Sequence, residues 1–424
     1  MSATSDPTAP AAPAPPTSSG APPSASPAAT SAAPFIDTLS ADYDFDIHTA
    51  HRRARAESFY ATTPLGLVFL DYEAVHWLLH ERRFRLQGND ALDLAGIPDG
   101  PLRSWFGQIL SNREGEPHAR LRRLVSRAFT PRQVDRLRPM MRATAQEFID
   151  SLAGRSTCEF VEDFAAPYPV RVIGSLLGVP AADFARFHAW SRDLSLAFGS
   201  RIATERPRIE AALGNLCDYV DGLVARLRRS PGEDLTSALI ALESAGGDHL
   251  DADELRAMVT VLIFGGQDTT QCQLACAIAT FARHPDAWRF LAEHPEHASD
   301  AAEEVLRFEP AGSGNPRTAL EDIEYRGLSI PAGSVVLPSA PAANRDPKVY
   351  PDPDRFDVLR EHDEPQLTFG GGVHFCLGAS LARFEIAEVL PLLARRMPDL
   401  ALDGAIEWRR GSLIRGPERL PIRF

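Results

Sequence analysis

Apolar residues recur at helical spacing over most of the chain from about Pro34 onward. This pattern predicts helices over Val134 to Leu152, Arg208 to Arg229, Ala252 to Ala282, Asp300 to Phe308 and Leu377 to Arg396. The predicted helix over Ala252 to Ala282 is long and mostly apolar, so we expect it to run through the core.

Strand patterns are few and short. Thr63 to Leu70 is typical of a strand, and Ile323 to Tyr325 with Leu328 to Ile330, turned by Pro331-Ala332-Gly333 onto Val335 to Leu337, is typical of a hairpin. The proline-rich stretch Ala340 to Gln366 shows neither period and is predicted to be an irregular connection. The chain is therefore expected to be mainly α-helical with a smaller β-rich lobe.

Residues 1–34 differ from the rest of the chain. They hold nine prolines, many Ala, Ser and Thr, and one charged residue, Asp6. Such a segment buries too little apolar surface to offset its ordering entropy, so a disordered tail is expected. It lacks the basic start and apolar core of a signal peptide, and no apolar run approaches the roughly 20 residues that span a bilayer. A cytoplasmic protein without a membrane anchor is expected.

Charge and cysteine usage narrow the function classes. The net charge of −13 over 424 residues disfavours nucleic acid as a partner. Five cysteines, an odd number, argue against a disulfide scaffold. Cys272 and Cys276 lie one helical turn apart, but no second Cys or His pair accompanies them, so packing explains them better than a metal site. Between Arg113 and Arg142, nine arginines face three acidic residues, which indicates an anionic contact or a solvated helix face.

One cysteine stands in an unusual loop. Residues 369–378 read Phe-Gly-Gly-Gly-Val-His-Phe-Cys-Leu-Gly and place Cys376 just before a predicted helix. A thiolate, the metal-binding form of cysteine, needs hydrogen-bond donors and an electropositive setting. The glycines let backbone N–H groups approach the sulfur, and a helix starting after Cys376 points its positive end at it. A buried structural cysteine is the alternative from the loop alone.

A second polar cluster, Gly265-Gly266-Gln267-Asp268-Thr269-Thr270, interrupts the long apolar helix. A buried acid is costly unless satisfied, and each glycine weakens a helix by about 1 kcal/mol relative to alanine. We expect a locally opened helix that holds water and presents Asp268 and Thr269 to a reacting centre. A threonine bonded back to its own helix beside a capped aspartate is the alternative.

The loop matches Phe-Gly-x-Gly-x-His-x-Cys-x-Gly, and on it the chain resembles the cytochrome P-450 superfamily, whose cysteine thiolate binds haem iron. The resemblance covers nearly all of 35–424 and implies one domain of that fold, with haem b between the long central helix and the helix after the loop. It implies that Cys376 is the iron ligand, with Phe369 and Gly370 in the haem-binding loop. It also implies that Asp268 and Thr269 relay protons for oxygen activation.

Further motifs of the family occur in order. The resemblance implies contacts to the haem propionates from His118, Arg122, Arg317 and His374. The family commonly has a His three residues before the loop's Phe, where this chain has Gln366. Glu304, Arg307 and Arg355 match the family's Glu-x-x-Arg helix and its third member, which implies a network that holds the cysteine loop rather than catalytic groups.

The resemblance implies a monooxygenase that uses O2 and NAD(P)H to hydroxylate or epoxidise a hydrophobic or amphipathic organic substrate, in secondary metabolism or catabolism. The substrate pocket is expected to draw on Leu86 to Phe106, Val261, Phe264, Ala311 to Asn315 and Ser412 to Ile414.

Electrons are expected from a separate ferredoxin or flavodoxin-type donor, steered by arginines near Arg113, Arg120 and Arg123. Two alternatives stay open. One is a peroxide-using or non-hydroxylating haem-thiolate oxidase, and the other is a non-catalytic haem sensor or carrier.

Overall fold

The computed structural model describes residues 33–244, 248–361 and 363–424. The predicted tail therefore lies outside the described residues except for its last two. Of these, Pro34 already joins the folded part, because its carbonyl accepts a hydrogen bond from the Thr62 N–H at 2.9 Å.

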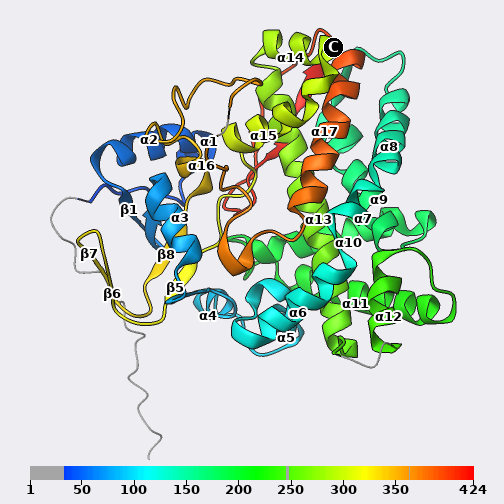
Figure 1. The fold of residues 1–424 in the computed structure, drawn as a ribbon, viewed down its shortest axis with the longest axis horizontal. Helices are drawn as coiled ribbons and strands as arrows, with labels where there is room; N and C mark the ends of the chain where they lie inside the picture. Colours follow the sequence, from blue (N-terminus) through cyan, green and yellow to red (C-terminus); the bar gives the residue numbers. More distant parts are fainter. Residues whose placement is uncertain (1–32, 245–247, 362) are drawn as a thin grey trace, which may run out of the picture.

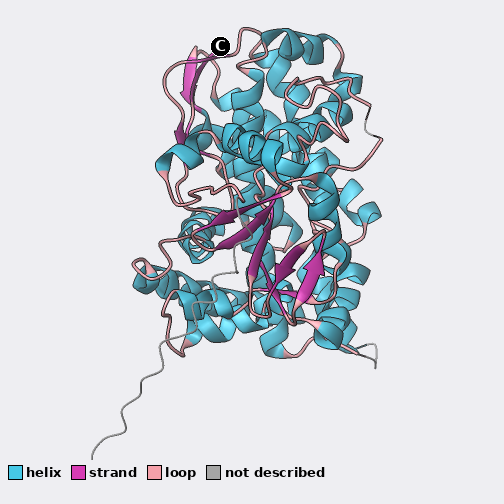
Figure 2. Ribbon diagram, turned by 90° about the vertical axis from the view of Figure 1, so that its left-hand side faces the viewer, coloured by secondary structure: helices cyan, strands magenta, loops and turns pink. Residues whose placement is uncertain are grey.

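Helices form most of the described chain (Figures 1 and 2). The α-helices are α1 (Ala41–Phe45), α2 (Ile47–Glu57), α3 (Tyr72–His80), α4 (Asp90–Leu94), α5 (Pro101–Gln108), α6 (Gly115–Ala128), α7 (Pro131–Asp135), α8 (Arg138–Ser151), α9 (Pro167–Leu176), α10 (Phe184–Ser195), α11 (Arg206–Arg229), α12 (Leu235–Ser244), α13 (Ala252–Phe281), α14 (Pro285–Glu293), α15 (Ala298–Phe308), α16 (Ala340–Ala343) and α17 (Ala379–Arg396).

The strands form small sheets. They are β1 (Tyr60–Thr63), β2 (Gly66–Phe69), β3 (Phe84–Leu86), β4 (Thr157–Glu159), β5 (Arg317–Ala319), β6 (Ile323–Tyr325), β7 (Leu328–Ile330), β8 (Val335–Pro338), β9 (Ala401–Leu402), β10 (Glu407–Trp408), β11 (Pro417–Arg419) and β12 (Pro421–Arg423). One sheet has the order β1-β2-β8-β5-β3 and another the order β4-β12-β9, while β6 pairs with β7 and β10 with β11. The prediction of a mainly helical chain with a smaller β-rich lobe is confirmed.

Four predicted helices, now α11, α13, α15 and α17, are confirmed to within two residues at each end. The fifth, Val134 to Leu152, is wrong in its first part, because α7 ends at Asp135 and a new helix, α8, begins at Arg138. Pro139 stands in the first turn of α8. Proline lacks an N–H and fits the start of a helix rather than its interior, so it marks a new helix here.

Two strand predictions need correction. The predicted strand Thr63 to Leu70 contains β2 but begins too early, because Thr63 is the last residue of β1, which pairs with β2 in a hairpin. Gly66, at the start of β2, has φ 136° and lies where a Cβ would come within 2.3 Å of the Val335 carbonyl oxygen. The hairpin partner of β7 is β6 alone, closed by Arg326 and Gly327 at φ 50° and 79°. Positive φ at both turn residues suits a tight two-residue hairpin. β8 instead pairs in parallel with β2 and antiparallel with β5.

The described residues of the predicted irregular stretch Ala340 to Gln366, which are 340–361 and 363–366, are irregular except for one short helix. The first four residues form α16, whose N-cap Ser339 accepts a hydrogen bond from the Ala342 N–H at 3.3 Å.

The long helix α13 organises the core. It begins at a capping box in which Asp251 and Glu254 each accept a hydrogen bond from the other's backbone N–H, at 2.8 and 3.1 Å. α13 packs against α9, α10 and α11 and also against α15 and α17. The five-stranded sheet and α1 to α3 gather on the left in Figure 1, and the turn that precedes Cys376 contacts α3. The cysteine loop is therefore held between α3 and α17.

Candidate functional site

Cys376 lies where the glycine-rich loop meets α17. Its N–H donates to the Phe369 carbonyl at 2.9 Å, which closes the loop on itself. The side chain is open to solvent on one side but otherwise enclosed by protein, and this enclosure raises the pKa of the thiol. The Gly378 N–H and the guanidinium groups of Arg122 and Arg383 lower that pKa. These donors and cations are the setting in which a thiolate can be held as a metal ligand.

The predicted propionate contacts come together around Glu114. The rings of His118 and His374 lie 4.4 Å apart, and His374 Nε2 is 3.1 Å from a Glu114 carboxylate oxygen. Burial and the neighbouring His374 lower the pKa of His118 to about 4. Burial alone would raise the pKa of Glu114, but hydrogen bonds from His374 and the Leu86 N–H outweigh it, so the pKa of Glu114 is lowered. No sequence motif indicated Glu114.

Arg317 is a buried cation that lacks a partner at one atom. It is 5% exposed in β5, and its Nε forms no hydrogen bond within the described residues. Burial lowers the pKa of Arg317, against the attraction of Glu114. An unpartnered buried guanidinium atom is costly and is satisfied by an anion brought beside it. The residues present therefore fit haem, whose propionates would meet Arg317, Arg122 and His118 while Cys376 faces the iron.

The predicted opening of α13 at its glycine pair is wrong, because α13 is continuous from Ala252 to Phe281. Packing explains the second glycine: a Cβ on Gly266 would lie 2.6 Å from Ile173 of α9. Gly265 differs, since it is exposed and a Cβ there would meet no described atom within 4 Å. The helix thus leaves open space beside Gly265, where a flat cofactor or a substrate can approach its backbone.

The acid and the alcohol on α13 are both engaged in the structure. Thr269 Oγ1 donates to the Gly265 carbonyl at 2.6 Å, so the back-bonded alternative is the one observed. Asp268 is 2% exposed and pairs with the Arg409 guanidinium at 2.8 Å. Burial lowers the pKa of Arg409, but the neighbouring Cys272 and Asp268 outweigh burial, so the pKa of Arg409 is raised. Arg409 also lines a surface cleft of about 690 Å3, so this pair connects the buried acid with solvent. No sequence motif indicated Arg409.

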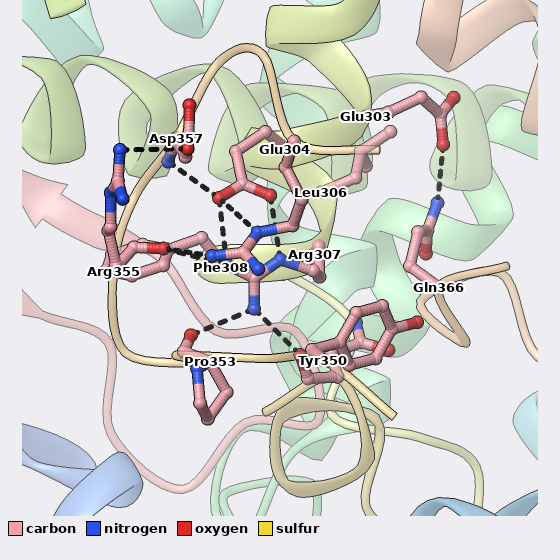
Figure 3. A network of polar contacts seen from close by, with 12 residues as sticks. Glu303, Glu304, Leu306, Arg307, Phe308, Tyr350, Pro353, Arg355, Asp357 and Gln366 are labelled. Carbon is pink, nitrogen blue, oxygen red and sulfur yellow. Dashed lines mark hydrogen bonds and ion pairs between the residues drawn. The ribbon is translucent and has the colours of Figure 1, made fainter. Parts of the chain in front are cut away.

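Figure 3 shows the network around Arg307. The Arg307 and Glu304 side chains are 0% exposed and joined by two hydrogen bonds of 2.7 and 2.8 Å. Arg307 also donates to the backbone carbonyls of Asn344, Pro353 and Arg355. It thus binds the irregular stretch before the cysteine loop to α15.

The predicted role of Arg355 needs correction. Its guanidinium is 69% exposed and pairs with Asp357 at 3.1 Å, so it reaches the network only through its carbonyl. The second guanidinium on Glu304 belongs to Arg360, at 3.4 Å, and Arg360 also binds the carbonyls of Pro351 and Arg355. The Arg360 side chain is 9% exposed and turns toward Glu304, whereas the Arg355 side chain points outward, so Arg360 completes the network.

Asn344 carries this support to the cysteine loop. Its side chain accepts from the Leu367 N–H at 2.7 Å and donates to Thr368 Oγ1 at 2.9 Å. Gln366, at the position where the family commonly has a His, donates to Glu303 at 3.3 Å, and Glu303 in turn binds Arg383. The guanidinium of Arg383 lies 4.5 Å from the Phe369 ring centre. Gln366 is therefore part of the support for the loop.

The segments predicted to line a substrate pocket contact one another in two separate groups. Gly312 pairs with Ile414 in an isolated β-bridge, and the Ser313 N–H donates to the Leu413 carbonyl at 3.1 Å. Phe264 of α13 stacks on Phe198 with ring centres 4.2 Å apart, and Phe106 lies 5.3 Å from Phe198. Phe198 was missed by the sequence analysis because it belongs to no motif.

The arginine-rich segment is only partly available to a partner. Arg120 is ion-paired with Glu254 and Asp248, and Arg123 with Asp248. The prediction that Arg120 and Arg123 steer an electron donor therefore loses its support, since acidic side chains already neutralise them. The exposed residues Arg127, Arg132 and Arg136 form no ion pair within the described part of the chain.

The structure also bears on the Cys272/Cys276 pair, on clusters of possible metal ligands and on helices that could span a membrane. The side chains of Cys272 and Cys276 are fully buried, and no group of three or more His, Cys, Asp or Glu in residues 33–244, 248–361 and 363–424 could hold a metal ion. Within the same ranges, no helix is both long and apolar enough to cross a bilayer.

The chain is similar in sequence and in structure to known proteins. The model of the cytochrome P450 family matches residues 218–396. The chain is 36% identical to the luteothin monooxygenase of Streptomyces thioluteus, over 92% of this chain and 96% of that protein. It is 38% identical to the nocardicin C N-oxygenase of Nocardia uniformis subsp. tsuyamanensis, over 92% and 98%. It resembles the crystal structure of epothilone D-bound cytochrome P450epoK with a TM-score of 0.84 at 30% identity, over 92% and 98%.

Proposed function

Because this chain belongs to the cytochrome P450 family, whose oxidoreductases bind haem through a cysteine thiolate, we propose that Cys376 is the iron ligand of a monooxygenase acting on a hydrophobic or amphipathic organic substrate. The observation that carries the proposal is the setting of Cys376. Of the five cysteines, all of them described, Cys376 alone is exposed. Enclosure by protein raises the pKa of its thiol, and the Gly378 N–H and the guanidinium groups of Arg122 and Arg383 oppose that rise. Burial raises the pKa of Cys158 and Cys272 to about 12.

When bound, haem supplies the iron chemistry with which this family activates O2. Two side chains of the chain, those of Thr269 and Asp268, position and deliver protons. Thr269 Oγ1 gives its hydrogen to the Gly265 carbonyl, so its lone pairs remain available to accept a hydrogen bond from a protonated group in the site. Asp268, released from Arg409, takes up a proton from the solvent of the cleft and donates it into the site, which returns the side chain to a carboxylate. Thr269 Oγ1 only accepts a hydrogen bond from the proton-bearing group and does not change its own protonation.

The substrate class is inferred from the apolar residues among the segments expected to line the pocket. Phe106 and Phe264, with Phe198 between them, form an aromatic cluster. The relatives named for luteothin and nocardicin C support a role in secondary metabolism, with oxidation at carbon or nitrogen. A separate ferredoxin or flavodoxin-type protein delivers electrons to the face of α6 and α7, where the exposed Arg127, Arg132 and Arg136 attract an acidic partner.

The reaction type is tested by labelling. Small molecules are first screened for those that shift the ferric haem spectrum, and the best binders are then incubated with NADPH, reductase and ferredoxin under ¹⁸O2. A monooxygenase yields product carrying one ¹⁸O atom. Product formed only with added hydrogen peroxide would support the peroxide-using alternative, and a stable oxygenated complex without product would support a sensor or carrier. Either of these results contradicts the proposed function.

A variant of Arg317 separates haem binding from folding. We expect Arg317→Leu to release haem about tenfold faster, because a charge-assisted contact to a propionate is lost. The haem-free protein should unfold no more easily than the parent, since the variant removes a buried cation with an unpartnered Nε. The measurements are haem transfer to excess apomyoglobin and thermal unfolding. Arg127→Leu, at an exposed position, is the control with the same charge change, and equal transfer rates for the two variants would contradict the assignment.

A further inference from the structure

The cysteine loop packs against the C-terminal end of α3. The loop turn Gly372–His374 contacts α3. Gly372 has φ 64°, and a Cβ there would lie 2.6 Å from the Leu79 carbonyl oxygen. A side chain at Gly372 would thus be strained by its backbone and blocked by the helix. The loop and the last two residues of α3 therefore fit each other closely.

His80, the last residue of α3, forms two hydrogen bonds, one as a donor and one as an acceptor. Its Nδ1 lies 2.8 Å from the His76 carbonyl oxygen, and its Nε2 lies 3.1 Å from the Gly372 backbone nitrogen. A carbonyl oxygen only accepts and a backbone N–H only donates. His80 must therefore be neutral, with its proton on Nδ1 and the lone pair of Nε2 directed at the Gly372 N–H.

Gly371 provides the space for this ring. A Cβ on Gly371 would come within 2.9 Å of His80 Cε1, 3.2 Å of Leu79 Cβ and 3.4 Å of His80 Nε2, so the His80 ring is its nearest obstacle. The φ of Gly371 is −163°, which any residue adopts, so backbone strain does not explain this glycine. The loop pattern Phe-Gly-x-Gly leaves this position open to other residues, and here it is the smallest one. The glycine is explained by the imidazole against which it packs.

We propose that His80 is a positioning residue for the iron-ligand loop: its Nε2 holds the Gly372 N–H and so fixes the turn that precedes Cys376. The bond ties the loop to α3, an element of the N-terminal lobe, whereas the Arg307 network supports it through α15. His80 is exposed, so this contact lies at the molecular surface. The inference rests on the proposed role of Cys376 as ligand.

The first test compares His80→Asn with His80→Gln in the haem-loaded chain. The side-chain oxygen of Gln reaches about as far as Nε2 and can accept from Gly372, whereas that of Asn ends near the place of Nδ1. The readout is the rate at which the red-shifted band of the reduced carbonyl complex converts to the unshifted band. We expect conversion about three- to tenfold faster in His80→Asn and His80→Ala, the range for one lost hydrogen bond, and within twofold of the parent in His80→Gln. Equal rates for Asn and Gln would overturn the proposal.

The variant Gly371→Ala provides a second test of the role of His80. Its Cβ must displace the His80 ring, so this variant should behave like His80→Ala. In the double variant the two effects should overlap, with Gly371→Ala adding less than twofold to the rate of His80→Ala. Effects that multiply would show that Gly371 acts through Leu79 rather than His80 and would contradict the packing of Gly371 on the His80 ring.

Hydrogen exchange separates this proposal from the identity of the ligand. In the intact chain, the amide of Gly372, followed in a peptide over 370–375, should exchange about tenfold faster in His80→Ala and His80→Asn than in the parent or in His80→Gln. If this pattern holds while the parent shows no red-shifted carbonyl band, the proposed function fails and the contact of His80 with the loop stands. If the band is present and exchange is unchanged in all variants, the role of His80 alone is overturned.

Discussion

Replacing Asp268 by asparagine is expected to slow product formation by about 10² to 10⁴-fold, the usual contribution of a general acid. Asparagine keeps the shape of the side chain and can still accept a hydrogen bond from Arg409, but it carries no transferable proton. Oxygen should still be reduced, because neither Cys376 nor the electron donor is altered. NADPH consumption should therefore fall less than product formation, with the difference released as hydrogen peroxide.

The control for Asp268→Asn is Thr270→Val, an isosteric change two residues along the same helix in a buried position. It should leave the ratio of product to NADPH within twofold of the parent. An Asp268→Asn protein with unchanged rate and unchanged ratio would contradict the relay. If, in addition, the parent and the variant formed product equally well from added hydrogen peroxide alone, the peroxide-using alternative would be favoured.

Glu304→Gln is expected to lower the free energy of unfolding by about 3–5 kcal/mol, because it leaves the Arg307 guanidinium charged in a place with no access to water. The carbonyl partners of Arg307 remain, but none of them carries a neutralising charge. The measurement is equilibrium unfolding in urea, followed by far-ultraviolet circular dichroism.

Glu407→Gln is the matched control for this pair. It breaks the Arg419–Glu407 ion pair, in which both side chains are more than half exposed, and should cost no more than about 1 kcal/mol. Similar destabilisation by the two variants would show that burial does not determine the strength of the Arg307 network.

The predictable part of the site consists of residues at fixed offsets within one segment. Cys376, His374 and Gly370 share one loop, and Asp268 and Thr269 share one helix, so local sequence is enough to propose them as site residues. Partners from distant segments were not predictable. Arg409 stands 141 residues after Asp268, and no local period or turn signal relates the two.

Two further errors have the same physical origin. Arg355 and Arg360 lie five residues apart in one irregular stretch, and only the tertiary fold decides which guanidinium turns inward to Glu304. β8 follows a proper turn signal, but its parallel pairing with β2 depends on a contact across more than 260 residues. Local patterns determine which elements form, whereas burial and long-range hydrogen bonding decide which of them meet.

The central claim is that Cys376 binds the haem iron as a thiolate. Its most direct test is the absorption spectrum of the reduced carbonyl complex, measured for the haem-loaded chain and for Cys376→Ser. We expect a red-shifted band in the chain and its loss in the variant, because serine cannot supply the sulfur ligand. A red-shifted band that persists in Cys376→Ser, or a haem-loaded parent without one, would contradict the assignment.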